Sequence, residues 1–189
     1  MNVYNKLSVL LTIFLYVYLV VQIRKGDVVQ NLATWLSWAL LDAVTGISLY
    51  VQHGNWYLLL PYVIGSLTIS YFILGSAKFT WGRIEIICFS LVIVSILVWT
   101  QLGPWYATIV ATTGVSIATY PQIKDAFLLP DTMPIKVFIG FTLVNALAVA
   151  GGKDWTIEER FYPATCTVLC MIIVGFSSRK YFVSRSPDA

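Results

Sequence analysis

Charged residues are scarce in this chain of 189 residues, and their scarcity excludes several classes of protein. Only 11% of the residues are charged, whereas an average soluble domain has about 25%. A disordered chain needs high charge and low hydrophobicity, and a nucleic-acid-binding protein needs a clustered basic face, for which a net charge of +3 gives no support. A small soluble domain has too much surface to hide an apolar composition. We therefore expect a membrane protein that binds no nucleic acid.

Cysteine and histidine are also few, with three and one residues. Cys88, Cys166 and Cys170 all lie inside apolar runs, which argues against a disulfide framework, and we interpret Cys166 and Cys170 as packing residues. His53 is expected to be a solvated residue at the end of a helix. The chain shows no nucleophile–base pattern, no phosphate-binding glycine loop and no lysine deep in its last apolar run for a retinal Schiff base. We expect no enzyme activity, no cofactor and no metal.

Apolar residues are abundant, at 58% of the chain with a mean hydropathy of +0.79. They form seven continuous runs, at residues 5–23, 32–52, 56–77, 82–101, 105–123, 134–150 and 159–180. Each run approaches the roughly 20 residues that a membrane-spanning helix needs, and none alternates like a barrel strand. Arg24 and Lys25 follow the first run where a signal peptide would have small residues. The sequence predicts an all-α polytopic membrane protein with seven transmembrane helices and short loops.

Basic residues lie mostly on one side of this predicted bundle. Alternating loops give one side nine of them, Arg24, Lys25, Lys78, Arg83, Lys124, Lys136, Arg179, Lys180 and Arg185. The other side has three, Lys6, Lys153 and Arg160. Because cytoplasmic loops are enriched in Lys and Arg, we expect the N-terminus outside and the C-terminus in the cytoplasm. The membrane is expected to be a plasma or inner membrane.

The chain contains an internal repeat at an offset of about 100 residues. Gln22-Ile23-Arg24 corresponds to Gln122-Ile123-Lys124. Polar residues spaced by four, and so on one helical face, also correspond: Ser8, Thr12 and Tyr16 with Thr108, Thr112 and Ser116. Pro61, Ser76 and Lys78 match Pro163, Ser178 and Lys180 at an offset of 102.

The repeat predicts two related three-helix bundles with a linker helix between them. The expected boundaries are 1–78 for the first bundle, 79–103 for the linker helix and 104–189 for the second bundle with a short cytoplasmic tail. Parallel repeats of this kind are related by an axis along the membrane normal, and their ligand sites lie near the midplane between the halves.

The segment Ala118-Thr119-Tyr120-Pro121-Gln122-Ile123-Lys124 resembles the PQ-loop signature, and the three-plus-one-plus-three organisation resembles the SWEET and PQ-loop transporter superfamily. The resemblance implies alternating access between two bundles, with sugar transport as one candidate activity. It also implies that Pro121 and Pro134 flex the fifth and sixth spans, with Gln22 and Gln122 at matching gating positions. The chain departs from the family by Val21 in place of the first proline and by lacking the asparagines of sugar-carrying members.

Asp42 is the one ionisable residue well inside a predicted span, which makes it a candidate functional residue. It lies eleven residues after Asn31, and Asn145 lies eleven residues after Pro134. At 1.5 Å per residue both are about 16 Å deep, near the midplane. We expect them to bind a small polar solute, a cation or a proton. The alternative is a structural hydrogen bond for Asp42 and interhelical contact for Asn145.

Trp35, Trp38 and Asp42 share one helical face, and Thr45 continues it. Two indoles beside a carboxylate would suit a ring or a cation. The spacing also resembles the Trp-x-x-Trp-x-x-x-Asn signature of PnuC-type vitamin transporters, with Asp in place of Asn. The alternative is that Trp35 anchors the helix at the membrane interface and Trp38 only packs.

Three functions remain open at this level. The first is a transporter whose solute is bound by Asp42, Asn145, Trp38, Trp35, Thr45, Tyr16, Thr112 and Ser116, and it is either passive or coupled to protons for an amino acid or a vitamin. The second is a non-transporting receptor or sorting protein of the same fold, and the third is a membrane assembly factor. The expected partners are a small-molecule solute, the lipid bilayer and, for the coupled form, protons. Neither a monomer nor a homo-oligomer is favoured.

Overall fold

A computed structural model describes residues 1–26, 28, 30–74 and 83–183, and this part of the chain is helical with no strand. The α-helices are α1 (Val3–Lys25), α2 (Leu32–Val51), α3 (Leu59–Leu74), α4 (Arg83–Leu102), α5 (Pro104–Ala118), α6 (Tyr120–Leu128), α7 (Ile135–Ala150), α8 (Tyr162–Ser177) and α9 (Lys180–Val183). A 3₁₀ turn, η1 (Pro130–Thr132), precedes α7, and a π-helical turn, η2 (Ile157–Phe161), leads into α8.

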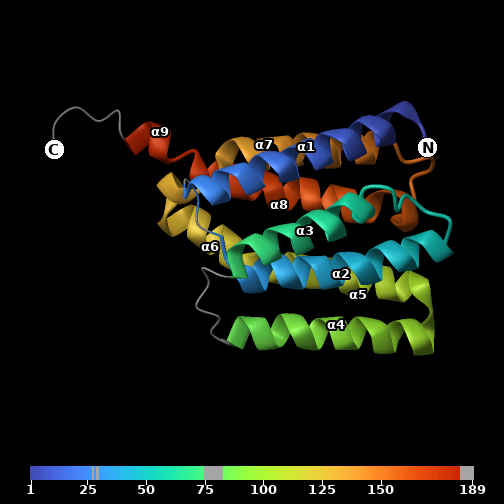
Figure 1. The fold of residues 1–189 in the computed structure, drawn as a ribbon. Coiled ribbons are helices and arrows are strands. Elements are labelled where there is room, and N and C mark those ends of the chain that lie inside the picture. Colours follow the sequence, from blue (N-terminus) through green and yellow to red (C-terminus); the bar gives the residue numbers. More distant parts are fainter. Residues whose placement is uncertain (27, 29, 75–82, 184–189) are drawn as a thin grey trace.

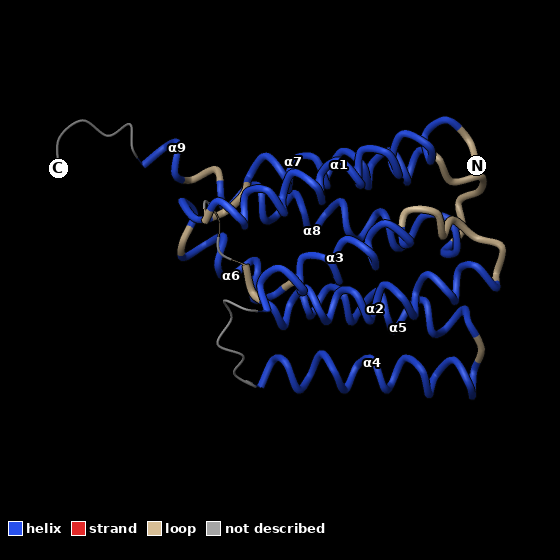
Figure 2. Tube along the Cα trace, in the orientation of Figure 1, coloured by secondary structure: helices blue, strands red, loops and turns tan. Residues whose placement is uncertain are grey.

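The long helices run side by side along one axis and alternate in direction (Figure 1). Their connections therefore gather at two ends of the bundle, as the loop segments in Figure 2 show. We call the end with residues 1–2, 52–58, 103 and 151–156 the N-terminal end. The end with residues 26, 28, 30–31, 129–134 and 178–183 is the C-terminal end.

Helix packing pairs elements that are far apart in sequence. Helix α1 packs against α7, and α2 packs against α5. Helix α3 packs against both α1 and α2, whereas α8 packs against α7 and α6 and more lightly against α5. Helix α4 lies at the flank of the bundle, on α5 and α2 (Figure 1).

Local signals set several of the helix ends. The side chains of Asn2 and Asn31 accept hydrogen bonds from Asn5 N at 3.0 Å and Thr34 N at 3.1 Å, which caps the free N–H groups of α1 and α2. Gly26 ends α1 at a φ of 77°, a left-handed conformation that glycine adopts without a steric penalty. The same property lets Gly103, at a φ of 94°, turn the chain between α4 and α5.

In α1 a polar face points into the bundle and an apolar face points outward. The buried residues of α1 are Asn5, Ser8, Thr12, Tyr16 and Leu19. Large apolar residues of the same helix are exposed, among them Leu10, Phe14 and Val17. The predicted stripes of α1 and α5 are therefore buried faces, with Ser116 alone only half-buried.

The seven predicted apolar runs correspond to helical segments, with one division that sequence reasoning did not predict. The fifth run is split at Thr119 into α5 and α6. Three segments are long and apolar enough to cross a membrane, namely Val3–Lys25, Leu32–Val51 and Ile157–Ser177, and three shorter apolar helices accompany them. Lys78, Ser76 and Arg185, with the predicted boundary at 78–79, lie outside the described residues.

The segment before α8 is held by hydrogen bonds of two charged side chains. Glu159 is 8% exposed and accepts a hydrogen bond from Lys153 N at 3.0 Å. The Arg160 guanidinium donates to the carbonyl oxygens of Val149, Asp154 and Gly152, which closes the end of α7. Free carbonyl groups at a helix C-terminus attract a cation, and this accounts for the partial burial of Arg160. His53 is exposed in its loop, as predicted.

Candidate functional site

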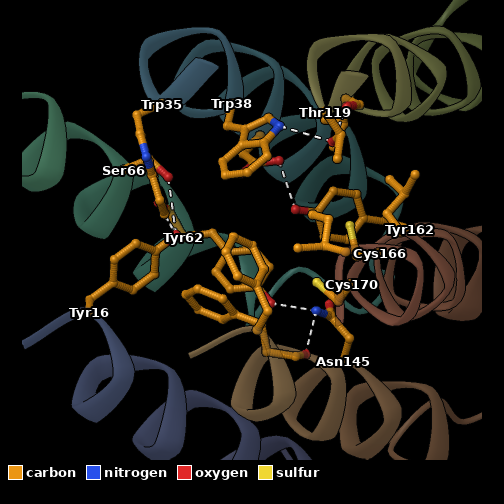
Figure 3. A pocket seen from close by; sticks show the side chains of 16 residues that line it. Tyr16, Trp35, Trp38, Tyr62, Ser66, Thr119, Asn145, Tyr162, Cys166 and Cys170 are labelled. Atoms are coloured by element: carbon orange, nitrogen blue, oxygen red, sulfur yellow. Dashed lines mark hydrogen bonds between the residues drawn. The ribbon is translucent and has the colours of Figure 1, made fainter. Parts of the chain in front are cut away.

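A small cavity of about 60 Å³ lies among α1, α2, α3, α5, α7 and α8 (Figure 3). We call it the central cavity. Its lining is mostly aromatic and apolar, and consists of Tyr16, Trp35, Trp38, Asp42, Tyr62, Ser66, Val115, Thr119, Phe138, Phe141, Asn145, Tyr162, Cys166, Leu169, Cys170 and Ile173. From Asp42 and Asn145 the cavity extends toward the C-terminal end, where Trp35, Phe138 and Ile173 lie.

The structure brings together five residues that the sequence predicted for a binding site. Tyr16 comes from α1, Trp35, Trp38 and Asp42 come from α2, and Asn145 comes from α7. Asp42 is 4% exposed and Asn145 is 1% exposed. The spacing of Trp35, Trp38 and Asp42 places all three on the cavity because α2 is a regular helix through this segment.

Three other predicted binding residues do not line the cavity. Thr45 is buried one turn beyond Asp42 toward the N-terminal end, and its hydroxyl donates to the carbonyl of Leu41 at 2.9 Å. Ser116 donates to the carbonyl of Thr112 at 3.2 Å. The Thr112 hydroxyl is buried, and within the described residues it has no hydrogen-bond partner. Their helical faces were predicted correctly, but the cavity ends before it reaches them.

Asp42 is held by a tyrosine from the far end of the sequence. The Tyr162 hydroxyl donates to Asp42 Oδ1 at 2.7 Å. Tyr162 is 2% exposed and belongs to the first turn of α8. This short hydrogen bond between two buried side chains joins α2 to α8.

Asn145 of α7 makes the corresponding contact with a tyrosine of α3. Its Nδ2 donates to the Tyr62 hydroxyl at 2.7 Å and to the carbonyl of Phe141 at 2.8 Å (Figure 3). Tyr62 belongs to α3, so α3 and α7 are joined as α2 and α8 are. Asn145 Oδ1 is buried and has no partner among the described residues. A buried acceptor without a partner is costly, and this one belongs to a side chain that lines a cavity.

An aromatic wall surrounds these polar groups. The ring centroids of Trp35 and Trp38 are 4.9 Å apart, and Tyr16 lies 6.0 Å from Trp35 and 5.3 Å from Phe141. Trp35 is 1% exposed and its indole N–H donates to Gln30 at 2.9 Å, so it packs inside the bundle instead of facing a membrane interface. The Trp38 indole N–H donates to the Thr119 hydroxyl at 3.1 Å.

The predicted gating residues lie outside the cavity. Pro121 is in the first turn of α6, directly after the break at Thr119, and has no N–H to donate to the carbonyl of Ile117. Gln122 is buried, and its Nε2 contacts Met133 Sδ at 3.4 Å. Gln22 is half-buried near the end of α1. Pro134 precedes α7 instead of lying within it, so it cannot bend that helix internally.

Sequence reasoning did not identify Tyr62, Tyr162, Thr119 or Phe141 as lining residues. One signal pointed to the two tyrosines, because each is adjacent to a proline of the repeat, Tyr62 to Pro61 and Tyr162 to Pro163. Cys166 and Cys170 also line the cavity. Within the described part of the chain, no group of three or more His, Cys, Asp or Glu residues could hold a metal ion.

The cavity is acidic in character. Asp42 is the one carboxylate among its described lining residues, and none of those residues is Lys, Arg or His. The hydroxyls of Tyr16, Tyr162 and Thr119 already take part in hydrogen bonds to protein atoms. The arrangement can therefore accept hydrogen bonds from a bound molecule at Asp42 and Asn145 and cover it with aromatic rings.

No protein-family model, curated protein or solved structure matches the chain.

Proposed function

We propose that this protein is a multi-pass membrane transporter that moves a small polar solute through the central cavity. One observation carries the proposal. Asp42 and Asn145 lie on the cavity between the segments α1–α3 and α5–α8, and each is hydrogen bonded to a tyrosine of the other segment. A polar site between two helical halves is typical of transporters that are built from repeats.

The distribution of polar residues supports a location in the membrane. Lipid cannot hydrogen bond to side chains, so polar groups of a spanning helix turn toward neighbouring helices. Helix α1 follows this rule, with Ser8 and Thr12 at 1% and 0% exposed and Phe14 at 65% exposed. A water-soluble helix would have the opposite arrangement.

The packing of the helices supports two related halves with α4 as the linker. If α1, α2 and α3 correspond to α5, α7 and α8, then the contact of α1 with α7 corresponds to that of α5 with α2. The contacts of α3 with α2 and of α8 with α7 also form an equivalent pair. The polar bonds follow the same relation, since Asp42 and Asn145 are on α2 and α7 and their tyrosines are on α8 and α3.

The basic residues support an orientation with the C-terminal end in the cytoplasm. Arg24, Lys25, Lys124, Arg179 and Lys180 all lie at or near that end. Lys6, Lys153 and Arg160 are near the N-terminal end. In this orientation the cavity extends toward the cytoplasm, and the outer side is closed by contacts between the two halves. Rocking of the halves would open the outer side and close the inner one.

Uptake into proteoliposomes tests the proposal. We expect at least one of four labelled solutes, D-glucose, L-serine, nicotinamide and choline, to enter proteoliposomes faster than protein-free liposomes. Asp42→Asn should reduce that uptake by at least about tenfold, because removing one partner of a buried charged contact costs several kcal/mol. Thr45→Val is the matched control, since Thr45 is buried on the same helix but does not line the cavity. Equal uptake in the presence and absence of the protein for all four solutes would contradict transport.

A proton-coupled form of the mechanism is supported by the position of Asp42 as the one carboxylate among the described lining residues. In that form Asp42→Asn abolishes accumulation driven by a pH gradient but leaves solute exchange intact. Loss of both processes would favour passive transport with Asp42 as a direct solute ligand. Binding of a solute in detergent without any flux would instead favour a receptor of the same fold.

A further inference from the structure

We propose that the solute is a small organic monocation, whose ammonium or guanidinium group is bound by Asp42 and Asn145 and whose apolar part packs on the aromatic wall. The inference deepens the proposed function and rests on the same cavity. It is based on the hydrogen-bond acceptors of the cavity that can take further donors, and on a described lining that contains one acidic and no basic side chain.

Two lining groups with spare hydrogen-bonding capacity are acceptors. A carboxylate can accept about four hydrogen bonds, and Asp42 accepts one from Tyr162. Asn145 Oδ1 accepts none from the described residues, although the side chain is 1% exposed. An ammonium or guanidinium group supplies several donors and no acceptor, so it complements both groups.

Most donors of the cavity are already engaged, the Tyr62 hydroxyl being an exception, and this disfavours an anion or a sugar. The Trp38 indole donates to Thr119, the Thr119 hydroxyl donates to Val115, and both amide protons of Asn145 have protein acceptors. A sugar presents hydroxyls that need donors as well as acceptors, and an anion needs donors or a basic residue. None of the described lining residues is basic.

The aromatic wall favours an organic cation over a metal ion. An alkali or alkaline-earth ion requires about six oxygen ligands, whereas the lining around Asp42 and Asn145 consists largely of rings. Trp35 and Trp38 are in contact at 4.9 Å between centroids, and Phe141 lies 5.8 Å from Tyr62. Ring faces attract organic cations electrostatically and also bury their apolar substituents.

Three pairs of ligands, each with one charged and one neutral member of similar shape, test the inference. The pairs are 3,3-dimethylbutylammonium with 3,3-dimethyl-1-butanol, guanidinium with urea, and benzylammonium with benzyl alcohol. The measurement is the melting temperature of the purified full chain in detergent, which rises when a ligand binds the folded state. We expect at least one charged member to raise the melting temperature more than its neutral partner does.

Substitutions at two lining positions connect this preference to the cavity. Asp42→Asn should weaken binding of the charged member by at least about tenfold and leave the neutral member unaffected. Trp38→Leu should also weaken binding of the charged member. Trp38→Phe should lose less of that binding, because a ring face is retained. Trp105→Leu is the control, since Trp105 is 38% exposed at the start of α5 and does not line the cavity.

The outcomes separate this inference from the transport proposal. A charge preference that disappears in Asp42→Asn supports the cation, with or without flux. The cation is rejected if neutral members bind equally well, if Asp42→Asn keeps the preference, or if no pair shows one. Uptake of a neutral solute without any charge preference would retain transport and overturn the cation. Binding of a cation to a protein that gives no flux would overturn transport alone.

Discussion

At the scale of single residues, the bond between Tyr162 and Asp42 is the contact with the largest expected energetic effect. Tyr162→Phe removes the hydroxyl that donates to Asp42 at 2.7 Å and leaves the ring in place. A hydrogen bond to a charged group contributes about 1.5–3 kcal/mol, against about 0.5–1.5 kcal/mol for a neutral one. We expect Tyr162→Phe to lower the free energy of unfolding more than Tyr62→Phe, which loses only the contact with the Asn145 amide. Equal losses in denaturant titrations would contradict an ionised Asp42.

The close approach of Tyr16 to Gly65 gives a second prediction at this scale. A Cβ on Gly65 would lie 2.3 Å from the Tyr16 ring, so the ring would have to move. Gly65→Ala should therefore destabilise the protein by about 1–3 kcal/mol and weaken solute binding. Gly175→Ala is the matched control, because no atom lies within 4 Å of its added methyl group. The control should be neutral or more stable, since alanine favours a helix. A stable Gly65→Ala variant would contradict the packing of Tyr16.

The sequence identified the residues of α2 that line the cavity, because residue spacing in a regular helix predicts both the shared face and the depth of each residue. Asp42 and Asn145 were placed at one depth by counting residues, and both line the cavity. The same periodicity also selected Thr45, which does not line the cavity. Periodicity shows which residues share a helical face, but it does not show where along the helix a cavity ends. Tyr62 and Tyr162 were missed because their partners are 83 and 120 residues away, and such distant contacts depend on tertiary packing.

At the scale of elements, the division of the fifth span at Thr119 is the main departure from the predicted continuous helices. Its cause is local, since Pro121 cannot donate to the carbonyl of Ile117. The Thr119 hydroxyl donates to the carbonyl of Val115 at 2.7 Å and accepts the Trp38 indole N–H, so the break lies beside the cavity. The apolar runs of the sequence located the helices. Hydropathy alone does not show where a proline interrupts a helix, so this break was not predicted.

This break gives a prediction for the transport cycle. Pro121→Ala restores an N–H, favours one continuous helix through α5 and α6, and should slow solute uptake while leaving solute affinity unchanged. Pro134→Ala is the control and should change neither quantity, because Pro134 already lies outside α7. The measurements are the initial rate of uptake in proteoliposomes and the ligand concentration that gives half of the maximal thermal shift. A similar slowing by both substitutions would contradict a specific role for the break at Thr119.

At the scale of the whole molecule, the hydrogen bonds between the halves that the described residues make are unequal at the two ends. At the N-terminal end, Asn55 Nδ2 donates to the carbonyl of Ala148 at 3.0 Å, and its backbone N–H donates to the carbonyl of Glu158 at 3.1 Å. Asn2 Nδ2 donates to the carbonyl of Gly151 at 2.7 Å. Near the C-terminal end, the described residues include one side-chain bond from α2 to the α5–α6 segment, from the Trp38 indole to Thr119. In the proposed transport cycle, this asymmetry corresponds to a state closed at the N-terminal end.

If the molecule alternates between two states, weakening the N-terminal closure should shift it toward the state open at that end. Asn55→Ala removes the bonds of one side chain, and a hydrogen bond contributes about 0.5–1.5 kcal/mol, so the population ratio should change by about two- to tenfold. The measurement is the labelling of Cys170, which lines the cavity, by a membrane-impermeant maleimide added from either side of proteoliposomes that carry Cys88→Ser and Cys166→Ser. We expect faster labelling from the N-terminal side and slower labelling from the other. Asn31→Ala is the control, because Asn31 caps α2 within its own half. Equal changes on both sides would indicate general loosening and contradict alternation.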